Sequence, residues 1–167
     1  LLSIARFGSS LSKYDPKDRR YHTEGLMGPD EFHEMYAGAK KSGLKDNAYT
    51  NLMIVWTLIK SLETLRILPE YHRERALNKL GISQRELSRW DDIIRKMKMI
   101  IDENGIISQF DGYFDLKELN WFLYKIKYRS IKRLDRILNA EGLSPDEYKV
   151  SKQADATMIF YLLTLPE

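Results

Sequence analysis

The loop formed by residues 25–34 holds side chains suited to proton transfer. Asp30 and Glu31 are adjacent carboxylates, and His33 and Glu34 follow within three residues. A carboxyl group beside a second carboxylate keeps its proton to higher pH, because like-charge repulsion raises its pKa, and it can then act as a general acid. The simpler alternative for Glu31 is a solvated loop carboxylate. For His33 we favour loop packing or a backbone hydrogen bond over direct chemistry, and Glu34, at the edge of the segment, is the weaker acid candidate.

A second candidate pair lies near the C-terminus of the chain. Lys152 and Gln153 are neighbours near the expected start of the last helix. Their ammonium and amide groups offer several hydrogen-bond donors. The alternative is a solvated pair at a helix N-terminus. No metal site is expected, because the chain has 3 histidines without metal-binding spacing and no cysteine.

The elements that must position these side chains are predicted to be helices. Apolar residues recur at three- and four-residue steps, and strand-like alternation is almost absent. An S-x-x-E capping box and glycines at helix ends mark several boundaries. We therefore predict an all-α fold, with irregular loops at 9–30 and 106–115. The predicted helices are the opening residues 1–7, then 47–68, 70–80, 83–104, 116–127 and 131–140, and a last helix starting near Ser151.

Composition excludes several classes of protein. The 27 basic and 24 acidic residues are mixed along the chain and give a net charge of only +3, whereas a nucleic-acid binder gathers basic residues on one face. Apolar runs are far shorter than the ~20 residues that span a bilayer. The absence of cysteine excludes disulfides, and the first residues lack the features of a secretory signal. A cytoplasmic protein that binds neither nucleic acid nor membrane is expected.

Several segments, in order, resemble the central domain of glycoside hydrolase family 65, which includes maltose, trehalose and kojibiose phosphorylases. Each is short, and their order over most of the chain makes the match specific. They are Gly25–Glu34, Asp46–Asn51, Gln109–Phe114, Leu134–Leu138 and Tyr148–Asp155.

The resemblance implies a fold and roles for particular residues. Residues 1–167 would form part of the catalytic (α/α)6-barrel domain, about its second half. Glu31 would be the general acid that protonates the glycosidic oxygen. Lys152 and Gln153 would contact the glucose unit that is transferred.

The activity implied is phosphorolysis of an α-glucose disaccharide with inversion, giving β-glucose 1-phosphate. Inorganic phosphate is the nucleophile and co-substrate, so no cofactor and no second carboxylate for activating water are needed. The expected partners are the disaccharide and phosphate. Two alternatives stay open: a trehalase-like hydrolase of the same family, and a non-catalytic helical remnant or interaction module.

The chain also departs from the family pattern. Lys45 and Asp46 stand where an acid and an amide are usual, and neither the sugar-binding W-D-x-E segment nor the phosphate-binding serine loop is present. The opening residues read as the end of an apolar helix, so the chain is expected to begin inside an element. We therefore expect an isolated chain that is inactive without a complementary chain or a second copy, because positioning contributes as much as proton transfer.

Overall fold

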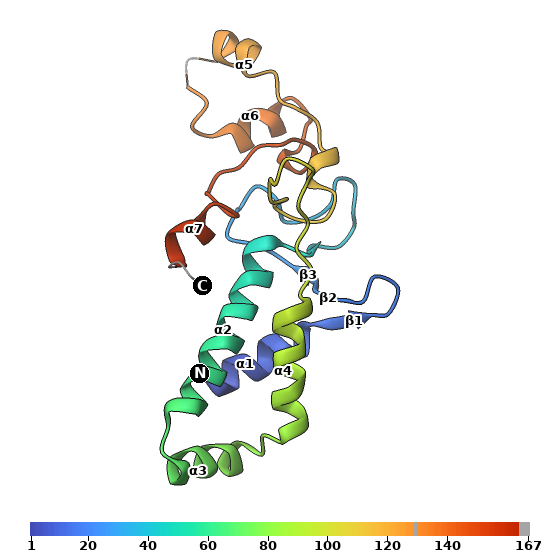
Figure 1. Cartoon of the computed structure of the whole chain (residues 1–167). Coiled ribbons are helices and arrows are strands. Elements are labelled where there is room, and N and C mark those ends of the chain that lie inside the picture. The colour runs from blue at the N-terminus through green and yellow to red at the C-terminus, as the bar shows by residue number, and fades with distance from the viewer. Residues whose placement is uncertain (129, 164–167) are drawn as a thin grey trace. The chain divides into compact units, whose positions relative to one another are not determined.

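The computed structural model describes residues 1–128 and 130–163, which divide into two compact units. Unit 1 comprises residues 1–23 and 50–99, and unit 2 comprises residues 24–49 and the chain from residue 100 onward. The described chain is mostly helical, as predicted, but it also contains short strands in two antiparallel pairs (Figure 1). In the described ranges, no helix is both long and apolar enough to cross a bilayer.

Unit 1 is built mainly from helices that the sequence predicted. Gly81 ends α3 in the left-handed conformation, with φ of 60°, and the hydroxyl of Ser83 accepts the Glu86 N–H at the start of α4. Local capping chemistry therefore sets these boundaries. The elements are α1 (Leu2–Leu11), β1 (Lys13–Asp15), β2 (Arg20–His22), α2 (Ala48–Ile67, of which residues 50–67 belong to unit 1), α3 (Glu70–Leu80) and α4 (Gln84–Lys96).

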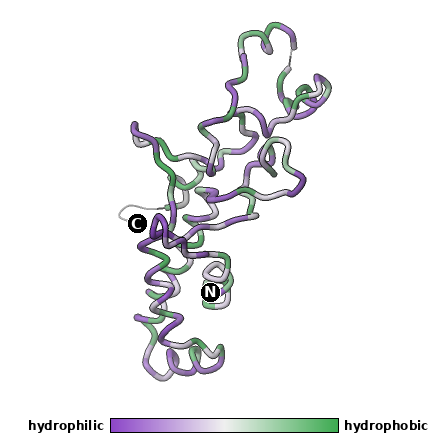
Figure 2. Tube along the Cα trace, turned by 90° about the vertical axis from the view of Figure 1, so that its right-hand side faces the viewer, coloured by the Kyte–Doolittle hydropathy of each residue, from purple (hydrophilic) through white to green (hydrophobic). Residues whose placement is uncertain are grey.

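The core of unit 1 is apolar and joins α1, α2 and α4. Leu58, Trp90 and Ile93 are fully buried there. Hydrophobic and hydrophilic stretches alternate along its helices (Figure 2), as expected for helices that pack against a core on one side and face solvent on the other. Arg6 of α1 forms an ion pair with Glu86 of α4, with Nε and Oε1 2.8 Å apart, which links the two helices outside the core.

Two predictions for unit 1 and the following loop are wrong. The segment 9–30 is not simply an irregular loop, because it includes the end of α1, the antiparallel β1–β2 hairpin and a third strand. The helix predicted over 83–104 ends at Lys96. Met97 forms a parallel bridge with Tyr21, and the Lys98 N–H donates to the Tyr21 carbonyl at 2.9 Å, so strand pairing replaces the next helical turn.

Unit 2 has shorter elements and longer connections. Its elements are β3 (Glu24–Leu26), β4 (Leu44–Lys45), the 3₁₀ turn η1 (Tyr113–Asp115), α5 (Trp121–Lys127), α6 (Leu134–Ala140), η2 (Pro145–Glu147) and α7 (Met158–Leu162). Strands β3 and β4 pair antiparallel. The predicted helix 116–127 begins only at Trp121, and the last helix begins at Met158 rather than near Ser151. Residues around Ser151 are bound by side chains from elsewhere in unit 2 instead.

A small apolar cluster anchors unit 2 beside its loops. Phe32, Leu119, Leu134, Leu138 and Val150 are buried together. The aromatic residues between 110 and 124 were expected in a core, and this is correct for only part of the set. Phe110 is buried, whereas Phe122 is 73% exposed. Helix α5 has seven residues and turns Tyr124 toward the cluster, which leaves Phe122 on its outer side.

Candidate active site

The three residues predicted to act on substrate lie together in unit 2. The Lys152 ammonium forms an ion pair with the Glu31 carboxylate. The Gln153 side chain makes two hydrogen bonds to the same residue: its Nε2 donates to Glu31 Oε1 at 2.6 Å, and its Oε1 accepts the Glu31 N–H at 3.0 Å. The Glu31 side chain is 59% exposed. The structure thus joins an accessible carboxyl group to donors about 120 residues away in sequence.

Asp30 has the opposite environment from its neighbour Glu31. It is 2% exposed, and both carboxylate oxygens accept hydrogen bonds. Oδ1 accepts the backbone N–H groups of Phe32 at 3.2 Å, Lys152 at 2.9 Å and Gln153 at 3.4 Å. Oδ2 accepts from Gln109 Nε2 at 3.0 Å. The carboxylate therefore ties its own loop to two distant segments.

His33 is buried beside Asp30 and links it to a further segment. Its Nδ1 lies 3.2 Å from Asp30 Oδ2, and its Nε2 lies 3.0 Å from the Tyr148 carbonyl oxygen. Both ring nitrogens therefore have a polar partner within unit 2. The rings of Phe110 and Tyr113 pack against it, with centroids 5.2 and 5.6 Å away. Both roles favoured from the sequence, loop packing and a backbone hydrogen bond, are present in the structure.

A second buried carboxylate extends the network. Asp155 is 3% exposed and its Oδ2 accepts from Asn47 Nδ2 at 3.2 Å and from Gln109 Nε2 at 3.4 Å. Gln109 therefore bridges the carboxylates of Asp30 and Asp155. A Cβ atom at Gly28 would lie 2.1 Å from Asp155 Oδ2, so this glycine leaves room for the network to close.

The three carboxylates have differently shifted pKa values. Burial alone raises the pKa of Asp30, but hydrogen bonds from His33, Gln109 and two backbone N–H groups outweigh it and hold the pKa at about 2. Burial raises the pKa of Asp155. Hydrogen bonds from Lys152 and Gln153 lower the pKa of Glu31. The expected repulsion from Asp30 does act to raise the pKa of Glu31, but the hydrogen bonds from the two donors outweigh it, so the net shift is downward.

A cavity of about 200 Å³ lies against this network. Gln109, Tyr113, Ser151 and Asp155 contribute to its walls. Carboxylate, amide and hydroxyl groups beside an aromatic ring are the kinds of groups that bind a polar organic ligand.

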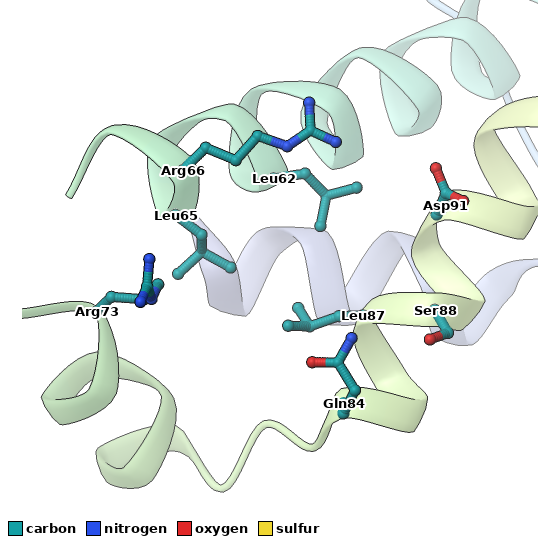
Figure 3. A pocket seen from close by; sticks show the side chains of 8 residues that line it. All are labelled: Leu62, Leu65, Arg66, Arg73, Gln84, Leu87, Ser88 and Asp91. Atoms are coloured by element: carbon teal, nitrogen blue, oxygen red, sulfur yellow. The ribbon is translucent and has the colours of Figure 1, made fainter. Parts of the chain in front are cut away.

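Unit 1 has a pocket of its own, with a volume of about 320 Å³ (Figure 3). Leu62, Leu65 and Leu87 form its apolar part, and Arg66 and Arg73 lie at its edge. It contains none of the residues predicted to act on substrate.

One group of potential metal ligands occurs among the described residues. Asp15, Asp18 and His22 have ligand atoms within 4.8 Å of one another. The Asp18 carboxylate already accepts from Lys98 Nζ at 3.0 Å and lies 3.1 Å from His22 Nε2. These neighbours account for the arrangement, and we assign no metal to it.

Three residues of the buried network, Asn47, Gln109 and Asp155, were not predicted from the sequence. Each lies in a segment that carried the family resemblance, but none was assigned a role. Their buried hydrogen bonds join residues 46 to 108 positions apart. Only the resemblance offered a signal for them, because local patterns do not reveal contacts of that range.

Comparison with known proteins agrees with the motif order. Residues 1–166 match the glycosyl hydrolase family 65 central catalytic domain. The chain is 47% identical over 167 residues to an uncharacterized glycosyl hydrolase of Mycobacterium tuberculosis, covering 100% of this chain and 12% of that protein. It is 44% identical over 146 residues to the trehalose 6-phosphate phosphorylase of Lactococcus lactis, covering 87% of this chain and 17% of the relative.

A solved structure assigned to a kojibiose phosphorylase from the human microbiome shares the fold. It superimposes with a TM-score of 0.69 at 26% identity, over 96% of this chain and 21% of the other. The chain thus spans about an eighth to a fifth of the length of the relatives it matches. It belongs to glycosyl hydrolase family 65 and corresponds to part of the central catalytic domain.

Proposed function

We propose that this chain is part of an inverting α-glucoside phosphorylase in which Glu31 is the general acid. Glu31 donates its proton to the glycosidic oxygen, while inorganic phosphate attacks the anomeric carbon from the opposite face. The products are β-glucose 1-phosphate and the released sugar. The observation that carries this proposal is the exposed Glu31 carboxyl group, which is held by the side chains of Lys152 and Gln153.

Lys152 and Gln153 are proposed to bind the hydroxyl groups of the glucose unit that is transferred. An ammonium and an amide supply donors for sugar oxygens, and the amide also supplies an acceptor. Their position beside Glu31 would bring the bound sugar and the acid within reach of one another. Their backbone N–H groups are held by buried Asp30, which limits their movement.

The lowered pKa of Glu31 sets a requirement for this role. Hydrogen bonds from Lys152 and Gln153 stabilise its ionised form, whereas a general acid must hold a proton when the substrate is in place. Sugar hydroxyls that take over these two donors would remove that stabilisation. Exclusion of water around the bound sugar would raise the pKa of Glu31 further.

The remaining parts of the site are proposed to come from outside this chain. The helices described here would contribute about half of an (α/α)6 barrel, and the phosphate-binding groups would lie in the rest of the domain. The 167-residue chain alone is then expected to be inactive. Named relatives that are phosphorylases favour phosphorolysis over the hydrolase and remnant alternatives.

An exchange of segments tests the proposal. The part of the Lactococcus lactis trehalose 6-phosphate phosphorylase that matches this chain would be replaced by it, and phosphate-dependent cleavage of trehalose 6-phosphate would be measured. We expect the chimera to be active and Glu31→Gln to lower its rate by about 100-fold or more. The matched control is Glu34→Gln, which removes another exposed carboxylate from the same loop and should leave the rate unchanged.

The outcomes separate the candidate functions. A Glu31→Gln chimera as active as the unsubstituted chimera would exclude Glu31 as the acid. Cleavage that does not depend on phosphate would favour the hydrolase.

A further inference from the structure

The carboxylate of Asp30 connects the acid loop to the pair of residues that faces the acid. Its Oδ1 accepts the backbone N–H of Lys152 at 2.9 Å and that of Gln153 at 3.4 Å. The side chains of the same two residues then turn to Glu31. Adjacent carboxylates therefore bind the same dipeptide, one through its backbone and the other through its side chains.

The Asp30 carboxylate is itself held firmly. Gln109 donates to Oδ2 at 3.0 Å, His33 Nδ1 lies 3.2 Å from the same oxygen, and the Phe32 N–H donates to Oδ1 at 3.2 Å. The residue is 2% exposed, so water competes little for these bonds. Hydrogen bonds to an ionised acceptor are about twice as strong as those between neutral groups.

The segment that Asp30 binds has no regular structure of its own. Residues 149–157 contain neither helix nor strand, and α7 begins at Met158. The rigidity that a helix start would have given Lys152 and Gln153 must come from elsewhere. The two N–H bonds to Asp30 supply it at the residues that need it.

We propose that Asp30 is a positioning residue, whose buried carboxylate fixes the Lys152–Gln153 backbone so that both side chains meet the Glu31 carboxyl group. Any contribution of Asp30 to catalysis rests on the proposed function of Glu31. The positioning of Lys152 and Gln153 by Asp30 does not rest on that function, and it can be measured without an activity assay.

The test measures the pKa of Glu31 by NMR titration of its side-chain carboxyl carbon in the 167-residue chain, with Glu31→Gln used to assign the signal. Two possible roles of Asp30 predict opposite changes in the pKa of Glu31 when Asp30 is replaced in the variant Asp30→Asn. If Asp30 acts on Glu31 only by its charge, removing the charge lowers the pKa of Glu31, because repulsion from Asp30 raises it. If Asp30 positions the donors, their release raises that pKa toward its ordinary value.

We expect the pKa of Glu31 to rise in Asp30→Asn, and a fall or no change would overturn the proposal. Asp30, Lys152 and Arg133 are charged groups whose fields reach Glu31. Glu34→Gln is the control for loss of one carboxylate from this loop, and it should leave the pKa of Glu31 nearly unchanged.

A second measurement covers the case in which Asp30→Asn does not fold. In the unsubstituted chain, the backbone N–H groups of Lys152 and Gln153 should exchange with solvent far more slowly than in an unstructured peptide. Exchange of both at the peptide rate would overturn the proposal. Neither measurement depends on Glu31 being the acid, so an active Glu31→Gln chimera would refute the function and leave the positioning role standing.

Discussion

Unit 1 and unit 2 are each stabilised internally by a different kind of interaction. Unit 1 buries Leu58, Trp90 and Ile93 between helices, whereas unit 2 surrounds its candidate site with buried polar groups, including Asp30 and Asp155. An apolar core is non-directional and tolerates changes of shape that keep its volume. A polar network depends on the angle and distance of each bond. Lys152 and Gln153, whose side chains contact Glu31, lie in unit 2, where the buried contacts are directional.

The largest loss of stability should follow from truncating a buried side chain in the apolar core of unit 1. Leu58 lies in α2 and is 0% exposed, so Leu58→Ala should lower the free energy of unfolding by about 3 kcal/mol through lost burial and a residual cavity. The matched control is Ile67→Ala on the same helix, where the side chain is 82% exposed and the loss should stay below about 0.5 kcal/mol. Urea denaturation measures both. Equal losses would contradict the assignment of the core.

Acid should weaken the polar network of unit 2 through Asp30. Its folded pKa of about 2 lies below the ordinary 3.8, so its contribution is complete above about pH 4 and is lost as the pH falls toward 2. The linked free energy is about 2 kcal/mol. The contribution of Asp155 to stability depends on pH in the opposite direction. Its pKa is raised in the folded chain, so this contribution is lost as the pH rises.

Urea denaturation between pH 5 and pH 2 measures the contribution of Asp30. The stability of the unsubstituted chain should fall by about 2 kcal/mol more than that of Asp30→Asn over this interval. A difference between the two that does not change with pH would show that the carboxylate is not stabilised by folding.

A smaller loss should follow from removing the bridge between the two buried carboxylates. Gln109→Met keeps the length of the side chain but removes the amide that donates to Asp30 and Asp155. We expect a loss of about 1.5 kcal/mol, because Asp30 keeps its other donors. Gln84→Met, at an exposed position of α4, is the control and should change stability by less than about 0.5 kcal/mol. A loss as small as the control's would mean that water replaces the amide.

The sequence predicted unit 1 better than unit 2, and the reason is the range of the interactions. Helices α2 and α3 are set by apolar spacing and by signals next to their ends, such as Pro69 and Gly81. Helix α4, which Ser83 caps, was predicted too long. Its end depends on the pairing of Met97 with Tyr21, a residue 76 positions earlier in the chain. In unit 2 the start of the last helix was missed, since Asp30 binds the segment that local spacing assigns to a helix.

By itself, the sequence determined the mostly helical content, the family and the identity of the three candidate residues Glu31, Lys152 and Gln153. These follow from local apolar spacing and from short motifs whose order along the chain is specific to the family. Only the tertiary structure decided which groups meet: Asp30 with the backbone 122 positions away, and Glu31 with the side chains of the same dipeptide. It also decided the direction in which the pKa of Glu31 shifts, because that shift depends on donors whose distance from the carboxyl group is fixed by folding.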